Sequence, residues 1–393
     1  MRRAAMYLVV VAALLVGAAA GAWGYRVIEG GGPARSQSPG AAPGAEPASG
    51  HPASSSSTTT TAATPIEVSS IAPADSALTG SRTPITVTFS SEVASASPLP
   101  SILPAVAGSW RRSGASLTFT PSVGYLPSSR VTLSIPGGPA GIEGTSGGRL
   151  GSTFTQRFRL GGGSVFRLQQ LLSLLDYSPL RWAPAGAPIS SKDAPALTAA
   201  LFRAPRGTFS WRQSGWPARL EAMWRPGVDN VFTKGLVMSF EADHGLSPDG
   251  AVDPALWSSL DAALAANEVN TGGYNYALAD KTGSEAFSVY HDGTVVLRSP
   301  ANTGIADSPT PDGTFPVYSR LREQVMRGQN PSGSHYADLV QYVAYFKGND
   351  AVHYMDRADF GIPQSLGCVE LPLADAARAW PFLAYGTLVT VTG

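Results

Sequence analysis

The chain has 393 residues, of which 43% are hydrophobic and only 14% are charged, and its formal net charge is zero. A nucleic-acid-binding surface needs an excess of Lys and Arg to displace counterions, so this balance argues against a nucleic-acid partner. The length predicts more than one domain. The 43 Gly and 32 Pro residues predict a large share of turns and linkers.

The first predicted element is an N-terminal membrane segment over residues 1–29. Arg2 and Arg3 precede the uncharged stretch 4–25, which is about the length of roughly 20 residues that a bilayer-spanning helix needs. The two arginines favour retention of that end in the cytoplasm and export of the rest. We favour an uncleaved signal anchor over a cleaved signal peptide, for which Ala18–Ala20 would suit a peptidase. The remainder is then expected at the cell envelope, outside the cytoplasmic membrane.

Residues 30–64 form a run of Gly, Ala, Pro, Ser and Thr with almost no large apolar side chains. Such a segment cannot bury enough surface to offset the entropy of ordering its chain. We therefore predict a disordered linker that holds the folded part away from the membrane.

Residues 65–160 have the pattern of an all-β domain. The stretches 85–89, 117–120 and 130–135 alternate apolar and polar side chains, which is typical of short, half-buried strands. The segments "SIAPADSALTGSRTPITVTFSSEV" and "GSWRRSGASLTFTPSVGYLPSSRVTLSI" resemble bacterial immunoglobulin-like modules of surface proteins. The resemblance implies a β-sandwich that acts as a spacer.

Residues 161–268 show helical periodicity. Apolar residues at 165, 168, 171, 172 and 175 fit one helix, a second is expected near 236–240, and a third follows the cap pair Asp253-Pro254. The pieces "VFRLQQLLSLLDYSPL" and "GLVMSFEADHGLSPDGAVDPALWSSL" resemble the two halves of a small peptidoglycan-binding helical module. An insertion, about 181–232, separates them and carries Trp182, Trp211, Trp216 and Trp224. The module either binds glycan or peptide, which exposed aromatic rings would favour, or only packs against its neighbours.

Residues 269–393 are again predicted to be mainly β. Alternating stretches occur at 287–290, 294–297 and 387–391, and Asp292-Gly293 is a strong hairpin signal. This segment also holds Cys368, the only cysteine of the chain. One cysteine cannot form an internal disulfide, and an odd cysteine in an exported protein is a candidate reactive thiol.

A catalytic cysteine needs a base, donors for the oxyanion and access for substrate. The chain has five histidines, and His353 is nearest in sequence to Cys368. Backbone amides around Leu366, Gly367 and Cys368 are candidate oxyanion donors, and Gly367 permits close approach of substrate. The alternative is a structural histidine and a small buried cysteine, and spacing alone leaves both interpretations open. The other histidines are His51 in the linker, His244 in the helical module, His291 beside the hairpin turn, and His335.

Three stretches then resemble the L,D-transpeptidase catalytic domain of the YkuD type: "SPTPDGTFPVYSR", "YVAYFKGNDAVHYM" and "IPQSLGCVELPLADAARAWPFLAYGTLVTV". The resemblance implies that Cys368 is the nucleophile and that His353 is the general base, oriented by its neighbouring backbone. It further implies that Ser365 and Gly367 shape the loop and that the amides of Gly367 and Cys368 stabilise the oxyanion.

The stretch departs from the family at two positions beside the cysteine. Leu366 stands where the family usually has a second histidine, and Glu370 stands where Arg or Asn is usual. The loop from His353 to Ser365 is also short for the family. For substrate contact the expected residues are Glu370, Tyr354, Pro311 and Gly313.

The expected function is that of a cell-wall L,D-transpeptidase that cross-links peptidoglycan through a cysteine thioester. No metal and no cofactor are expected. The implied partners are peptidoglycan stem peptides, carbapenem-type β-lactams as covalent inhibitors, and the membrane through the N-terminal helix. The alternatives are an L,D-carboxypeptidase that hydrolyses the same thioester and a non-catalytic peptidoglycan-binding protein with a degenerate catalytic domain.

Overall fold

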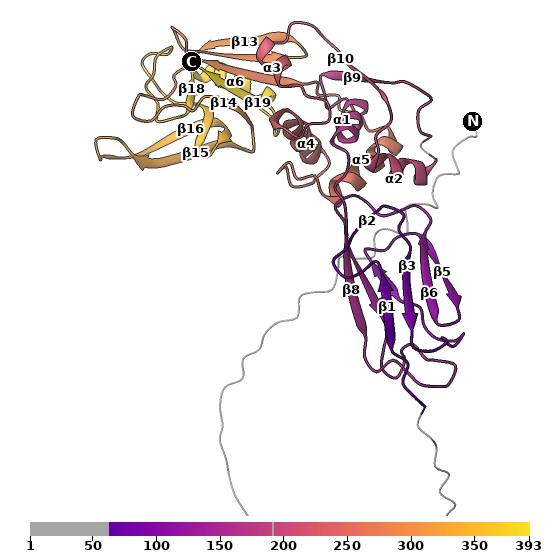
Figure 1. The fold of residues 1–393 in the computed structure, drawn as a ribbon. Helices are drawn as coiled ribbons and strands as arrows, with labels where there is room; N and C mark the ends of the chain where they lie inside the picture. The colour runs from indigo at the N-terminus through magenta and orange to yellow at the C-terminus, as the bar shows by residue number, and fades with distance from the viewer. Residues whose placement is uncertain (1–62, 191) are drawn as a thin grey trace, which may run out of the picture. The chain divides into compact units, whose positions relative to one another are not determined.

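The computed structural model describes residues 63–190 and 192–393 (Figure 1). The predicted signal anchor at 1–29 and nearly all of the predicted linker at 30–64 lie outside the described residues. Among the residues that are described, no helix has the length and apolar character needed to span a bilayer.

The first described domain consists of two four-stranded sheets, ordered β1-β3-β6-β5 and β2-β8-β7-β4. The predicted alternation at 85–89 is confirmed, because Ile85, Val87 and Phe89 are buried and the threonines between them are only half-buried. Side chains from both sheets form one apolar core, which is the arrangement of a β-sandwich. The strands are β1 (Val68–Ala72), β2 (Leu78–Thr79), β3 (Ile85–Phe89), β4 (Ser101–Leu103), β5 (Gly108–Ser113), β6 (Ser116–Pro121), β7 (Arg130–Ile135) and β8 (Phe154–Leu160).

The next region contains the three predicted helices, together with elements that periodicity did not reveal. The predicted cap is present, since Asp253 Oδ1 accepts a hydrogen bond of 2.9 Å from the Leu256 amide at the start of α5. The segment 181–232, predicted as an insertion, adds an antiparallel strand pair and two short helices. The elements are α1 (Val165–Leu174), β9 (Leu180–Pro184), α2 (Ala194–Phe202), β10 (Gly207–Trp211), α3 (Ala218–Met223), α4 (Val231–Asp243) and α5 (Pro254–Ala266).

The tryptophans of this segment belong to the core. Trp182 and Trp216 are only 7% and 6% exposed. Trp216 belongs to the main apolar cluster of this region, and the partly buried Trp211 and Trp224 pack against that cluster. Phe209 contacts both Trp182 and Trp224, with ring centroids 4.9 Å apart in each pair. These rings stabilise the fold by burying large apolar area, so they do not form the exposed aromatic surface that would favour glycan binding. Peptidoglycan binding by this region stays a prediction.

The C-terminal domain contains a five-stranded sheet ordered β13-β12-β11-β19-β14. The predicted hairpin turn is confirmed, because Asp292 and Gly293 connect β12 to β13 with φ values of 46° and 78°, as a type I′ turn requires. The strands are β11 (Asn275–Asp280), β12 (Ala286–His291), β13 (Thr294–Pro300), β14 (Gly313–Pro316) and β19 (Leu388–Thr392).

A second sheet of this domain, ordered β15-β16-β17-β18, positions the candidate site. Its last two strands are parallel, with Val352 paired to Val369 and His353 paired to Glu370. Val352 and Val369 are buried in the core that the two sheets share. Since side chains alternate along a strand, His353 and Glu370 must project from the opposite face. The elements are β15 (Ser319–Gln329), β16 (His335–Lys347), β17 (Asp350–Tyr354), β18 (Val369–Leu371), α6 (Leu373–Ala379) and the 3₁₀ turn Trp380–Phe382.

Candidate active site

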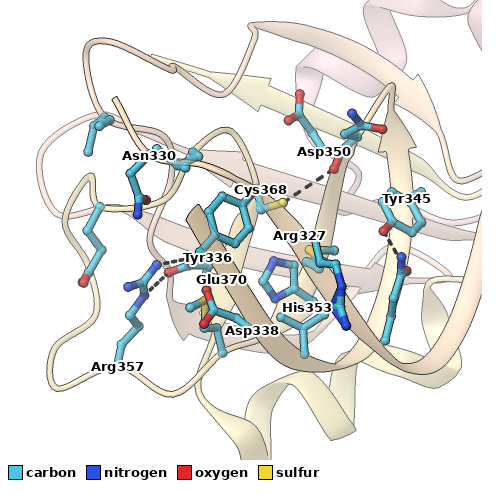
Figure 2. A pocket seen from close by; sticks show the side chains of 18 of the residues that line it. Arg327, Asn330, Tyr336, Asp338, Tyr345, Asp350, His353, Arg357, Cys368 and Glu370 are labelled. Carbon is cyan, nitrogen blue, oxygen red and sulfur yellow. Dashed lines mark hydrogen bonds and ion pairs between the residues drawn. The ribbon is translucent and has the colours of Figure 1, made fainter. Parts of the chain in front are cut away.

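A cavity of about 670 Å³ opens on that face of the β15–β18 sheet (Figure 2). Four of its lining residues have the period of two expected for one face of a sheet. It takes Cys368 and Glu370 from the β18 side, and His353 and Met355 from the β17 side. The proposed nucleophile and base therefore face the same space. The other charged and tyrosine side chains of the lining are Arg327, Tyr336, Asp338, Tyr345, Asp350 and Arg357.

The loop that carries Cys368 is fixed by hydrogen bonds of Ser365. The buried Ser365 hydroxyl donates to the Cys368 carbonyl at 2.6 Å and accepts from the Gly367 amide at 3.2 Å. The Gly367 amide is thus already paired, and of the two predicted oxyanion donors the Cys368 amide is the one left to consider. Both hydrogen bonds of Ser365 lie within the loop, and its contribution to a catalytic site stays a prediction.

Gly367 is needed for a reason other than the predicted approach of substrate. Its φ of +118° lies where residues with a β-carbon are strained. A β-carbon at this position would also overlap the Asp350 carboxylate. The packing of Asp350 against the loop, which no sequence motif indicated, therefore favours glycine here.

His353, the predicted base, is buried and hydrogen-bonded to the backbone. It is 2% exposed, and its Nδ1 lies 3.0 Å from the Tyr354 carbonyl. A carbonyl only accepts hydrogen bonds, so Nδ1 carries the proton and Nε2 has the free lone pair. Burial lowers the pKa of His353 below its ordinary 6.5, although the Tyr354 hydrogen bond and the Glu370 charge oppose this shift. The ring is therefore neutral at pH 7.

Cys368 rests as a thiol. Burial raises the pKa of Cys368 to about 12, a hydrogen bond from the Ala351 backbone opposes this rise, and the nearby carboxylates of Asp350 and Glu370 add to it. The Sγ atom lies 3.8 Å from the Asn349 carbonyl, to which the thiol donates. The dashed line from Cys368 in Figure 2 marks this contact. Deprotonation must accompany attack on substrate, because the resting site does not hold a thiolate.

Glu370 forms an ion pair with Arg357, a residue from the loop that follows β17. Arg357 Nε and Nη2 donate to Oε2 and Oε1 at 2.7 and 2.6 Å. The Glu370 side chain is 3% exposed and that of Arg357 is 26% exposed, so the guanidinium separates the carboxylate from solvent. The negative charge that the sequence places beside the cysteine is thereby neutralised within the protein.

The structure brings together only some of the predicted site residues. Cys368, His353, Leu366 and Glu370 line the cavity, whereas Tyr354, Pro311 and Gly313 do not. Tyr354 alternates with His353 along β17, so its side chain projects from the other face and contacts the apolar core. Gly313 begins β14, which pairs with β19 in the five-stranded sheet.

Sequence reasoning missed the lining residues Arg357, Asp350 and Tyr336. Arg357 comes four residues after His353, an even spacing that would place both side chains on the same side of an extended chain. This spacing was the one sequence signal for Arg357. Within the described part of the chain, no group of three or more His, Cys, Asp or Glu side chains is arranged to hold a metal ion.

The fold and this site define a mainly β, multidomain protein whose C-terminal domain has a cysteine and a histidine facing one cavity. Residues 274–391 match the model of the L,D-transpeptidase catalytic domain, and residues 62–160 match that of a bacterial Ig-like domain. The chain therefore contains an L,D-transpeptidase catalytic domain together with a bacterial Ig-like domain, as its sequence predicted.

Several solved structures of L,D-transpeptidases are similar to this chain. One from Mycobacterium smegmatis is 17% identical, covers 84% of this chain and 100% of its own, and has a TM-score of 0.29. L,D-transpeptidase 3 from Mycobacterium tuberculosis is 15% identical, with coverage of 83% and 98% and a TM-score of 0.28. The catalytic domain of an E. faecium L,D-transpeptidase, acylated by ertapenem, is 24% identical, with coverage of 30% and 98% and a TM-score of 0.28. No curated protein matches this chain.

Proposed function

We propose that this protein is a cell-wall L,D-transpeptidase in which Cys368 forms the acyl-enzyme and His353 transfers the protons. The observation that carries the proposal is the pairing of a cysteine and a neutral, backbone-oriented histidine on one cavity-lining sheet face. The match of residues 274–391 to the catalytic domain supports the same assignment. Donor and acceptor are expected to be peptidoglycan stem peptides.

The chemistry proceeds in two acyl transfers. In the first, the Cys368 sulfur attacks the carbonyl carbon before the terminal D-residue of a tetrapeptide stem, and His353 Nε2 takes the thiol proton. The tetrahedral oxyanion collapses, the C–N bond breaks, and the D-residue leaves as an amine that receives the proton from His353. In the second, an amine from another stem attacks the thioester and gives its proton to His353, and the departing Cys368 sulfur recovers that proton.

The resting geometry sets one condition on these reaction steps. The thiol that donates to the Asn349 carbonyl has to turn toward His353 before it transfers its proton. The raised pKa of Cys368 keeps the idle enzyme in its protonated, unreactive form. The nucleophilic thiolate then forms only as His353 takes the proton during attack on substrate.

Acylation by a carbapenem tests the nucleophile directly. Intact-mass measurement of the whole chain incubated with imipenem is expected to show one covalent adduct, and the Cys368→Ala variant is expected to show none. The absence of an adduct on the unaltered protein, or an equal adduct on Cys368→Ala, contradicts the assignment.

Product analysis separates the possible outcomes after acylation. With a tetrapeptide stem and an acceptor amine, a transpeptidase gives the cross-linked amide, whereas a carboxypeptidase gives the tripeptide with or without acceptor. If the protein is non-catalytic, the unaltered chain and the Cys368→Ala variant bind purified peptidoglycan equally well. Neither of them then converts the tetrapeptide stem, with or without the acceptor amine.

A further inference from the structure

The Arg357–Glu370 pair has a geometry that leaves one side of the arginine available to a ligand. Glu370 occupies the Nε–Nη2 edge of the guanidinium, because the two bonds come from those nitrogens. A guanidinium has five N–H groups in a fixed plane. Two of them bind Glu370. Three remain, and two of these, one on Nη1 and one on Nη2, point together along the Nη1–Nη2 edge.

Arg357 lines the same cavity as Cys368. Among the described residues, Arg357 makes no hydrogen bond other than the two with Glu370. Figure 2 shows Arg357 and Glu370 joined on one side of Cys368, with Asp350 on the other. The buried carboxylate holds the guanidinium in one orientation, so less side-chain entropy is lost when a planar anion binds to it.

We propose that Glu370 positions Arg357 to bind the terminal carboxylate of the donor stem peptide, an inference that rests on the proposed function. The residue that leaves in the first acyl transfer ends in a free carboxylate, and a planar carboxylate matches the two-nitrogen edge of arginine. The charge of Glu370 is offset by its ion pair with Arg357, whose side chain is the more exposed of the two. Glu370, two residues after Cys368, thus binds Arg357 and keeps its positive charge at the cavity.

Arg327 also lines the cavity, but none of the described buried carboxylates holds its guanidinium in place. Its side chain is exposed, and no ion pair holds it within the described residues. An exposed, unrestrained arginine loses more conformational freedom on binding. The fixed guanidinium of Arg357 is therefore the group that we assign to the carboxylate.

The test compares two tetrapeptide stems that differ only at the last residue, which ends in a carboxylate or in a carboxamide. Binding is measured by calorimetry on the whole chain carrying Cys368→Ala, so that no turnover occurs. We expect the carboxylate stem to bind roughly 10-fold more tightly, as one charge-assisted contact provides. Adding Arg357→Gln is expected to bring the affinity ratio to about one.

Matched variants keep the result interpretable. Arg357→Gln leaves a buried carboxylate without its partner, so Arg357→Gln/Glu370→Gln, which removes both charges, is expected to give the same ratio of about one. Arg378→Gln removes an exposed arginine that pairs with Asp375 at 3.5 Å outside the cavity, and it is expected to keep the full preference. Circular dichroism and melting temperature verify that each variant is folded.

Two results overturn the inference: equal affinity for both stems in the Cys368→Ala parent, or a preference that survives loss of Arg357. Either can occur while imipenem still acylates Cys368, in which case the proposed function stands without this subsite. An Arg357-dependent preference without acylation or turnover would instead support the carboxylate site in a non-catalytic protein and overturn the proposed function.

Discussion

The replacement Gly367→Ala tests how the loop beside the cysteine is built. The glycine has a φ of +118°, and a residue with a β-carbon in such left-handed conformations costs roughly 1–2 kcal/mol. The added β-carbon would also overlap Asp350 Oδ1 and lie 3.2 Å from its Cγ. The Asp350 carboxylate is the end of a side chain that can turn aside, so the overlap adds only about 1 kcal/mol. We expect a total loss of roughly 2–3 kcal/mol in the free energy of unfolding.

The lone cysteine provides the assay. Pulse labelling of Cys368 with a maleimide at increasing urea concentration reports unfolding of the C-terminal domain alone, because no other residue is labelled. Asp350→Ala is the control, and Asp350→Ala/Gly367→Ala removes the overlap but keeps the strained backbone. The double variant is expected to recover about 1 kcal/mol relative to Gly367→Ala once the effect of Asp350→Ala is subtracted. A Gly367→Ala protein as stable as the parent, or full recovery in the double variant, would refute the backbone argument.

Three further predictions concern the cysteine and the histidine. His353→Gln is expected to slow acylation by imipenem roughly 10²- to 10⁴-fold at pH 7, the usual contribution of a general base; an unchanged rate rejects the assignment. Because burial lowers the pKa of His353, the neutral base persists below pH 6.5, so the acylation rate should fall only as the pH drops through that lower pKa. A rate–pH profile with its midpoint at or above pH 6.5 would show that the pKa of His353 is not lowered. Finally, the pKa of Cys368, raised to about 12, predicts slower iodoacetamide labelling at pH 8.5 in the native protein than in urea, and Asp350→Asn is expected to speed the native reaction.

Sequence alone predicted the elements that depend on local patterns. The alternation in 85–89, the cap at Asp253 and the turn at Asp292-Gly293 all appear in the structure, because each depends on neighbours a few residues away. The placement of Cys368 on a turn, with His353 on a preceding strand, was also readable from order and spacing. The domain family came from the resemblance of three stretches of the sequence to the L,D-transpeptidase catalytic domain, and spacing alone did not indicate it.

Only the tertiary structure determined the surroundings of Cys368 and His353. The parallel pairing of β17 with β18 aligns His353 with Glu370, and this alignment places Tyr354 on the core face, away from the cavity. The same pairing brings Arg357 onto Glu370 and Asp350 against Gly367. Strand partners and register arise from packing between distant segments, and a shift of one residue would exchange the two faces. For that physical reason the sequence could indicate the candidate pair Cys368 and His353, and only the fold determined which charges surround them.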